Sequence, residues 1–149
     1  MSDSWPFPTL TPICQILDRW ADGWVFDDSI LLDPDRHVLS LEVHYLLYPA
    51  RSNGWREVLP IAVDRLIFDN IDTFEKRIPE GEGTLWLSTA SIICGESITF
   101  NFLQGSIRIL SAQESVLVST IISEENVTLF TLFGCELQLP HCKCKRYRQ

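Results

Sequence analysis

A regular alternation of apolar and polar residues between His37 and Tyr48 is the feature that most constrains the fold of this chain. The apolar members are Leu39, Leu41, Val43, Tyr45 and Leu47, and the polar members between them include Ser40, Glu42 and His44. Successive side chains of a β-strand point to opposite faces, so this period predicts a strand with one buried and one solvated face. Residues 98–102 and 127–131 show the same alternation.

Turn-forming residues separate the apolar segments that follow. Asp33-Pro34-Asp35-Arg36 is a strong turn sequence, because proline fixes φ and aspartate bonds nearby backbone. Gly95-Glu96, Gln104-Gly105 and Glu124-Glu125-Asn126 separate further strand-like runs, and we expect residues 55–63 and 66–68 to form two separate apolar segments. We therefore expect about eight or nine short strands after residue 28, without helices alternating between them. The predicted class is mainly β (α+β), as an antiparallel β-sandwich or a strongly curved sheet.

One helix is expected near the N-terminus, over about residues 12–22. Thr11 is a suitable N-cap, Pro12 suits the first helical position and Gly23 suits the end. The residues at helical spacing between them are Ile13, Ile16, Leu17 and Trp20. We expect this apolar stripe to cover an edge or an open face of the sheet.

The length of 149 residues predicts one domain over residues 1–149, with an extended lead-in over 1–10 and a basic tail over 141–149. The tail carries four basic residues and no acid. Because the whole chain has a net charge of −8, the first 140 residues carry −12. An acidic body repels nucleic-acid phosphates, so no direct nucleic-acid binding is expected. No apolar run is long enough for a membrane helix and no signal peptide is recognisable, which predicts a cytoplasmic protein without a membrane partner.

Candidate catalytic and metal-binding residues are few. The chain has three histidines, no Gly-x-Ser-x-Gly motif and no basic glycine-rich phosphate loop, so we expect no enzyme, no catalytic residue and no cofactor. Cys135, His141, Cys142 and Cys144 are residue types that bind zinc, but Cys142-Lys143-Cys144 lacks a second cysteine pair. We expect no metal site, with a structural zinc as the alternative. The five cysteines are an odd number, which indicates a reducing compartment.

Acidic residues and tryptophans near predicted loops are the candidate partner-binding residues. They are Trp24, Asp27, Asp28, Asp33, Asp35, Glu80, Glu82 and Trp86. Carboxylates would steer a basic protein surface toward this one, and amphipathic rings would anchor it. The alternatives are that the acids form turns and solvate the surface, and that the tryptophans pack in the core.

Three segments resemble a known group of proteins. They are residues 26–33 (Phe-Asp-Asp-Ser-Ile-Leu-Leu-Asp), 54–58 (Gly-Trp-Arg-Glu-Val) and 66–71 (Leu-Ile-Phe-Asp-Asn-Ile). Their order is similar to small β-rich immunity proteins of bacterial polymorphic and contact-dependent toxin systems. The similarity extends over about residues 24–72, and Asp27 stands where those proteins have a histidine. It implies a hairpin and a role in neutralising a toxin, and assigns no toxin-contacting residue.

We therefore expect a protein-binding inhibitor or immunity protein that neutralises a basic toxin, nuclease or effector by masking its active or substrate-binding surface. As a monomer or small homo-oligomer, it would act by occupying its partner. The alternative is a structural or assembly subunit of a larger protein complex, which would pair through exposed strand edges. A third hypothesis is an enzyme or small-ligand carrier, which requires a pocket with converging polar groups.

Overall fold

The structure is a computed structural model, and it describes residues 4–20, 22–47, 51–53, 56–93, 97–110, 115–130 and 136–138. Within the strands, the side chains of residues 51–53, 56–58, 89–93, 124–130 and 136–138 are not described. The basic tail and the four C-terminal candidate zinc ligands lie outside the described residues.

Twelve strands form one antiparallel sheet in the described part of the chain. They are β1 (Thr9–Pro12), β2 (Trp24–Phe26), β3 (Leu31–Asp33), β4 (Val38–Leu46), β5 (Arg51–Asn53), β6 (Arg56–Phe68), β7 (Thr73–Arg77), β8 (Thr84–Ile93), β9 (Ser97–Phe102), β10 (Gly105–Leu110), β11 (Ser115–Phe130) and β12 (Glu136–Gln138). The main path is β1-β11-β6-β4-β2-β8-β9-β10-β7, and β12, β3 and β5 pair with β11, β4 and β6. The predicted mainly β, antiparallel class is confirmed.

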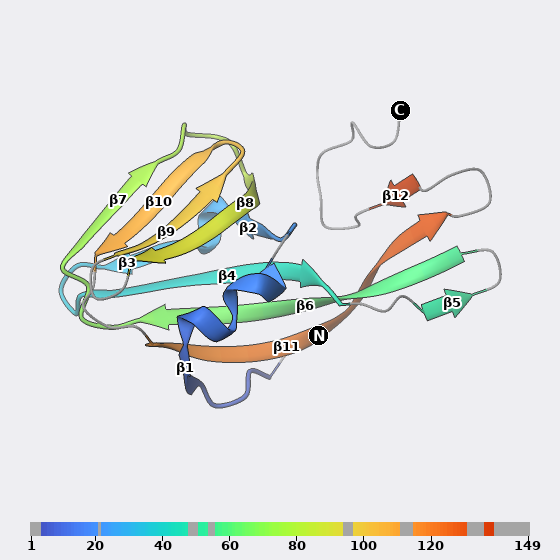
Figure 1. The fold of residues 1–149 in the computed structure, drawn as a ribbon, viewed down its shortest axis with the longest axis horizontal. Coiled ribbons are helices and arrows are strands. Elements are labelled where there is room, and N and C mark those ends of the chain that lie inside the picture. The colour runs from blue at the N-terminus through green and yellow to red at the C-terminus, as the bar shows by residue number, and fades with distance from the viewer. Residues whose placement is uncertain are drawn as a thin grey trace.

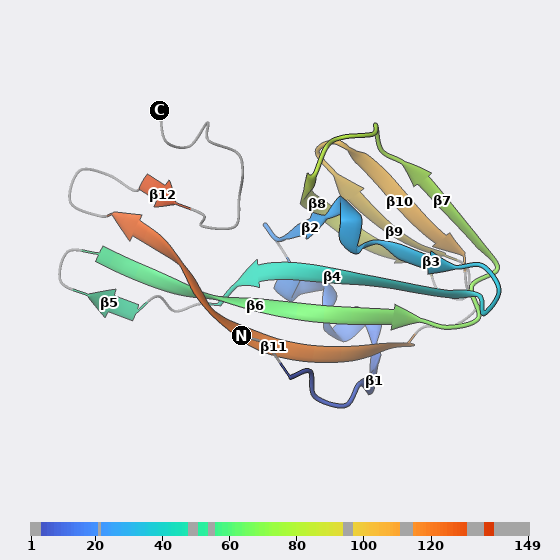
Figure 2. The ribbon, with the colours of Figure 1, turned by 180° about the vertical axis from the view of Figure 1, so that it is seen from behind.

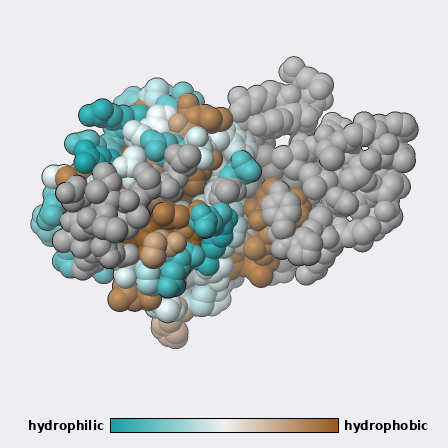
Figure 3. Space-filling model, viewed as in Figure 1, coloured by the Kyte–Doolittle hydropathy of each residue, from teal (hydrophilic) through white to brown (hydrophobic). Residues whose placement is uncertain are grey.

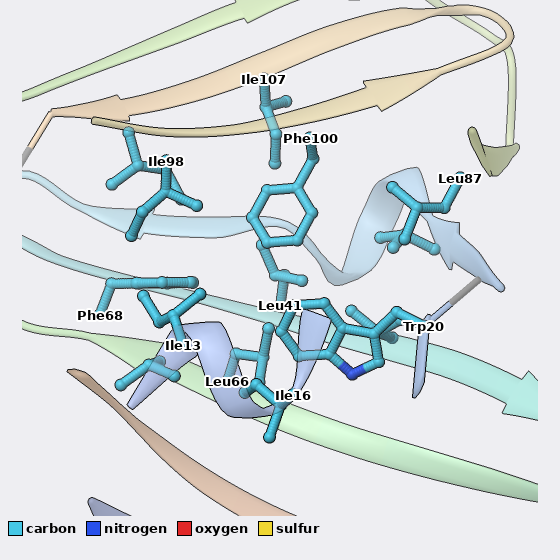
Figure 4. Close-up of a cluster of buried hydrophobic side chains, with 14 of the residues drawn as sticks. Ile13, Ile16, Trp20, Leu41, Leu66, Phe68, Leu87, Ile98, Phe100 and Ile107 are labelled. Atoms are coloured by element: carbon cyan, nitrogen blue, oxygen red, sulfur yellow. The ribbon is translucent and has the colours of Figure 1, made fainter. Parts of the chain in front are cut away.

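The sheet folds back on itself, which produces two layers around the larger of two hydrophobic clusters among the described residues, and Trp24, Leu59, Ile61 and Val63 form the smaller one. In Figures 1 and 2, β7, β10, β9 and β8 lie over β4, β6 and β11, and β2 joins the two layers because it pairs with both β4 and β8. The residues between the layers include Leu41, Leu66, Ile98, Phe100 and Ile107, and all of them are buried (Figure 4). The predicted alternation of β4 is confirmed, because Leu39, Leu41, Val43 and Tyr45 are buried while the residues between them are half-buried.

Two long strands replace shorter predicted ones. We expected a strand over 55–63 and a separate apolar segment at 66–68, but β6 runs unbroken through Asp64. We also expected a hairpin with a turn at 124–126, but β11 runs through this region with a register shift between Ser123 and Asn126. The shift lies opposite Pro60, which cannot donate a ladder hydrogen bond.

The predicted α-helix over 12–22 is wrong. Two 3-10 helices occupy the segment, η1 (Ile13–Gln15) and η2 (Leu17–Trp20), and Pro12 ends β1. The apolar stripe was informative all the same, because Ile13, Ile16 and Trp20 are almost completely buried. Apolar residues spaced three to four positions apart can share one face of a 3-10 helix as well as of an α-helix. Side-chain hydrogen bonds from Arg19 and Trp20 hold η2 against Asp64 of the sheet.

Gly23 lies where the backbone after η2 passes close to β4. Its N–H donates to the Trp20 carbonyl oxygen at 2.9 Å, and a Cβ atom would lie 2.7 Å from the His44 carbonyl oxygen. We expect Gly23→Ala to lower the free energy of unfolding by about 1–3 kcal/mol, because two backbone segments would have to move apart. Urea denaturation of both proteins measures the difference, and equal midpoints would contradict this close approach.

Candidate functional site

Four of the predicted acidic residues lie in two segments that are neighbours in the structure. Asp27 and Asp28 lie in the short 3-10 helix η3 (Asp27–Ser29), and the turn that contains Glu80 and Glu82 packs beside it. The Asp27 N–H donates to the Gly83 carbonyl oxygen at 2.8 Å. Figure 2 shows η3 between β2 and β3, close to the layer that contains β8. We name Asp27, Asp28, Glu80 and Glu82 the acidic surface.

Two glycines shape the turn that completes the acidic surface. Gly81 and Gly83 have φ values of +86° and +72°, which side chains with a Cβ rarely adopt. Their backbone bends around a shallow cavity of about 280 Å³. Its lining residues are Phe26, Asp27, Asp28, Gly81, Gly83 and Thr84.

The carboxylates of the acidic surface differ in their electrostatic environment. Lys76 Nζ lies 2.6 Å from Asp27 Oδ1, and the two side chains are 35% and 24% exposed. Asp28, Glu80 and Glu82 are exposed, and none of them forms an ion pair with another described residue. Asp27 therefore anchors η3 to β7, whereas the other three carboxylates are exposed to solvent.

Asp33 has a structural role in the turn between β3 and β4. Its Oδ1 atom accepts hydrogen bonds from the N–H groups of Asp35 and Arg36, at 3.1 and 3.2 Å. This is the turn-forming role that we considered as the alternative for these acids. Asp35 is exposed in the same turn.

The structure places the two candidate tryptophans inside an aromatic cluster. Trp24 is 1% exposed, its ring centroid lies 5.7 Å from that of Trp86, and it stacks on His44 at the same distance. Trp86 is half-buried. Trp24 therefore packs in the interior, as the core alternative predicted, and it presents no exposed ring to a partner. On the face seen in Figure 3, hydrophilic and hydrophobic patches are interspersed over the surface of the described residues.

A buried carboxylate at the centre of the sheet was not among the predicted site residues. Asp64 of β6 is 0% exposed. Its Oδ2 atom accepts hydrogen bonds from Arg19 Nε at 2.9 Å and Trp20 Nε1 at 2.8 Å. Its Oδ1 atom accepts them from Tyr45 Oη at 3.1 Å and Thr120 Oγ1 at 2.6 Å.

The Asp64 cluster joins η2 to three adjacent strands, which indicates a structural role. Burial, followed by the nearby Asp64 charge, raises the pKa of Tyr45 well above its ordinary value of 10.0, so its hydroxyl remains a donor at neutral pH. The sequence carried one signal for this cluster, which is an acid in the apolar run 59–68.

Searches for related proteins add no family to this description. No protein-family model, no curated protein and no solved structure matches the chain. None of the helices among the described residues has the length and apolar character needed to span a bilayer. In the same part of the chain, no three histidine, cysteine or acidic residues are grouped as a metal ion would require.

Proposed function

We propose that this chain is a protein-binding inhibitor of the immunity type, which binds a basic protein through the acidic surface and masks its active or substrate-binding site. The observation that carries the proposal is the joining of Asp27 and Asp28 with Glu80 and Glu82, about fifty positions further along the chain. The resemblance of residues 24–72 to toxin immunity proteins supports the same proposal.

The electrostatics of the acidic surface support binding to a basic partner. The exposed carboxylates of Asp28, Glu80 and Glu82 lie on two segments that are hydrogen-bonded to each other. The Asp27–Lys76 ion pair holds η3 to β7, and the Asp27 N–H bond to the Gly83 carbonyl oxygen holds η3 to the turn. A preorganised group of like charges raises the rate at which an oppositely charged protein associates. It also loses little conformational entropy on binding.

Affinity capture from the source cell tests this proposal. We expect the wild-type chain to retain a basic protein at low salt, and Asp28→Lys/Glu82→Lys to lose most of it. The matched control is Asp18→Lys/Asp72→Lys, which makes the same change in net charge at two exposed positions outside the acidic surface. Asp27 is kept, because its substitution would break the ion pair with Lys76. Equal retention by both variants would contradict the proposal.

A further inference from the structure

A row of side chains crosses five neighbouring strands on the face of the sheet opposite the larger hydrophobic cluster. Residues directly opposite one another in antiparallel strands share a face. The register pairs Leu31 with Ser40, Ser40 with Ile67, Ile67 with Leu117, and Leu117 with Leu10. We name these five residues the outer row, and its length across the strands is roughly 19 Å.

The outer row is open to solvent at both ends and apolar except for Ser40. Leu31 is 62% exposed and Leu10 is 65% exposed, while Ile67 and Leu117 between them are half-buried. Their strand neighbours Leu66, Val116 and Val118 point into the core and are buried, which confirms that the row lies on the other face. A solvated face of an antiparallel sheet is normally polar, so a row of this kind marks an interaction surface.

A groove runs beside Leu31 at the β3 end of the outer row. It encloses about 280 Å³, and its lining residues are Ser29, Leu31, Ser40, Leu41, Glu42, Arg65 and Ile67. Glu42 and Arg65 form an ion pair of 3.2 Å within it. Arg65 also lies over the ring of Trp5, 4.0 Å from its centroid, so both charges of the groove are already engaged.

The charges around this end of the row indicate the partner. Asp33 is paired with Arg36 at 3.8 Å, whereas the exposed Asp28 and Asp35, three and four positions from Leu31 in the sequence, form no ion pair with a described residue. A segment that places aliphatic side chains on the row would therefore gain from lysines or arginines beside them. A second copy of this chain has the same negative net charge and gains nothing comparable.

We propose that the outer row binds an extended segment of a basic protein, in which aliphatic side chains alternate with lysines or arginines. This inference rests on the proposed function, because Asp28 of the acidic surface lies three positions before Leu31 of the outer row and would attract the same partner. The outer row supplies the apolar contact surface that Trp24 cannot provide, because Trp24 is buried. The partner would be steered by the carboxylates and held by Leu10, Ile67, Leu117 and Leu31.

Two short peptides of equal length and charge test the outer row. One alternates lysine with leucine, the other alternates lysine with serine, and fluorescence anisotropy at low salt measures their binding to the full chain. We expect the leucine peptide to bind at least tenfold more tightly, because burial of one or two leucines accounts for that ratio. In the double variant Leu10→Ser/Leu31→Ser, the leucine peptide should bind no more tightly than the serine peptide.

The control for the peptide experiment is Leu103→Ser/Ile122→Ser, which removes two leucine-sized side chains that are 73% and 65% exposed elsewhere. It should leave the tenfold preference unchanged. Equal binding of the two peptides to the wild-type chain would overturn the proposal for the outer row without contradicting the proposed role of the acidic surface. Absence of binding by both peptides would overturn the proposed function and this inference together. A wild-type dimer that Leu10→Ser/Leu31→Ser dissociates in sedimentation would identify the row as a self-interface and overturn the proposal.

Discussion

Replacing Asp64 with alanine is expected to lower the free energy of unfolding by about 3–5 kcal/mol. The substitution removes the acceptor of Trp20 and Tyr45, which are 0% and 4% exposed, so both donors would lie in the interior without their partner. Arg19 adds less to this loss, because its side chain is 39% exposed and solvent screens its charge. Equilibrium denaturation in urea, followed by tryptophan fluorescence, measures the difference.

Arg19→Ala is the control for the Asp64 experiment, with an expected loss of about 1 kcal/mol. It removes a partly exposed partner and leaves the carboxylate with its bonds from Trp20, Tyr45 and Thr120. If Asp64→Ala cost no more than Arg19→Ala, the buried donors would have found other acceptors and the Asp64 cluster would not be a major source of stability. Asp64→Asn keeps the size of the side chain and separates the effect of charge from that of volume.

The second large effect is expected in the kinetics of partner binding. For the basic protein that the wild-type chain retains, Asp28→Lys/Glu82→Lys should lower the association rate constant at low salt by roughly tenfold to a hundredfold. Both carboxylates are exposed, so their main contribution is to long-range attraction. Dissociation should change less. Stopped-flow association over a series of salt concentrations tests this expectation.

The salt series also provides the control for steering. Screening shortens the range of the attraction, so the two association rates should converge as the salt concentration rises. Asp18→Lys/Asp72→Lys should associate at a rate close to the wild type throughout. A difference that persists unchanged at high salt would show that the substitutions remove direct contacts or disturb η3, in place of slowing the encounter.

The parts of the fold that the sequence predicted depend on short-range patterns. The alternation in 37–48 specified β4 and its buried face, because strand side chains have a period of two. The Asp33-Pro34-Asp35-Arg36 turn predicted the β3–β4 hairpin, and Gln104-Gly105 predicted the β9–β10 hairpin. Each of these elements follows from residues within a few positions of one another.

The incorrect parts depend on contacts between distant residues. Capping and spacing rules favoured an α-helix over 12–22, but η2 is held by bonds from Arg19 and Trp20 to Asp64, which lies more than forty positions away. Asp64 and Arg65 look like an interruption between apolar segments until their neighbours in β4 and β11 are known.

The candidate site was predictable in residue type and only partly in arrangement. The acids at 27–28 and 80–82 stood out as charge clusters, and nothing local indicated that η3 and the Gly81–Gly83 turn would meet. The ion pair of Asp27 with Lys76, the interior position of Trp24 and the outer row all depend on sheet register. That register is set by the whole chain.

The Asp64 cluster has a consequence for how quickly this protein reaches its native state. Its bonds join residues separated by 44, 45 and 56 positions, so long stretches of chain must close before the carboxylate has its donors. Proteins whose contacts mostly join distant residues fold more slowly than helical bundles, with folding times on the order of milliseconds to seconds. Any compact state that forms before the N-terminal segment docks would therefore lack the Arg19 and Trp20 donors of Asp64, and water would have to take their place.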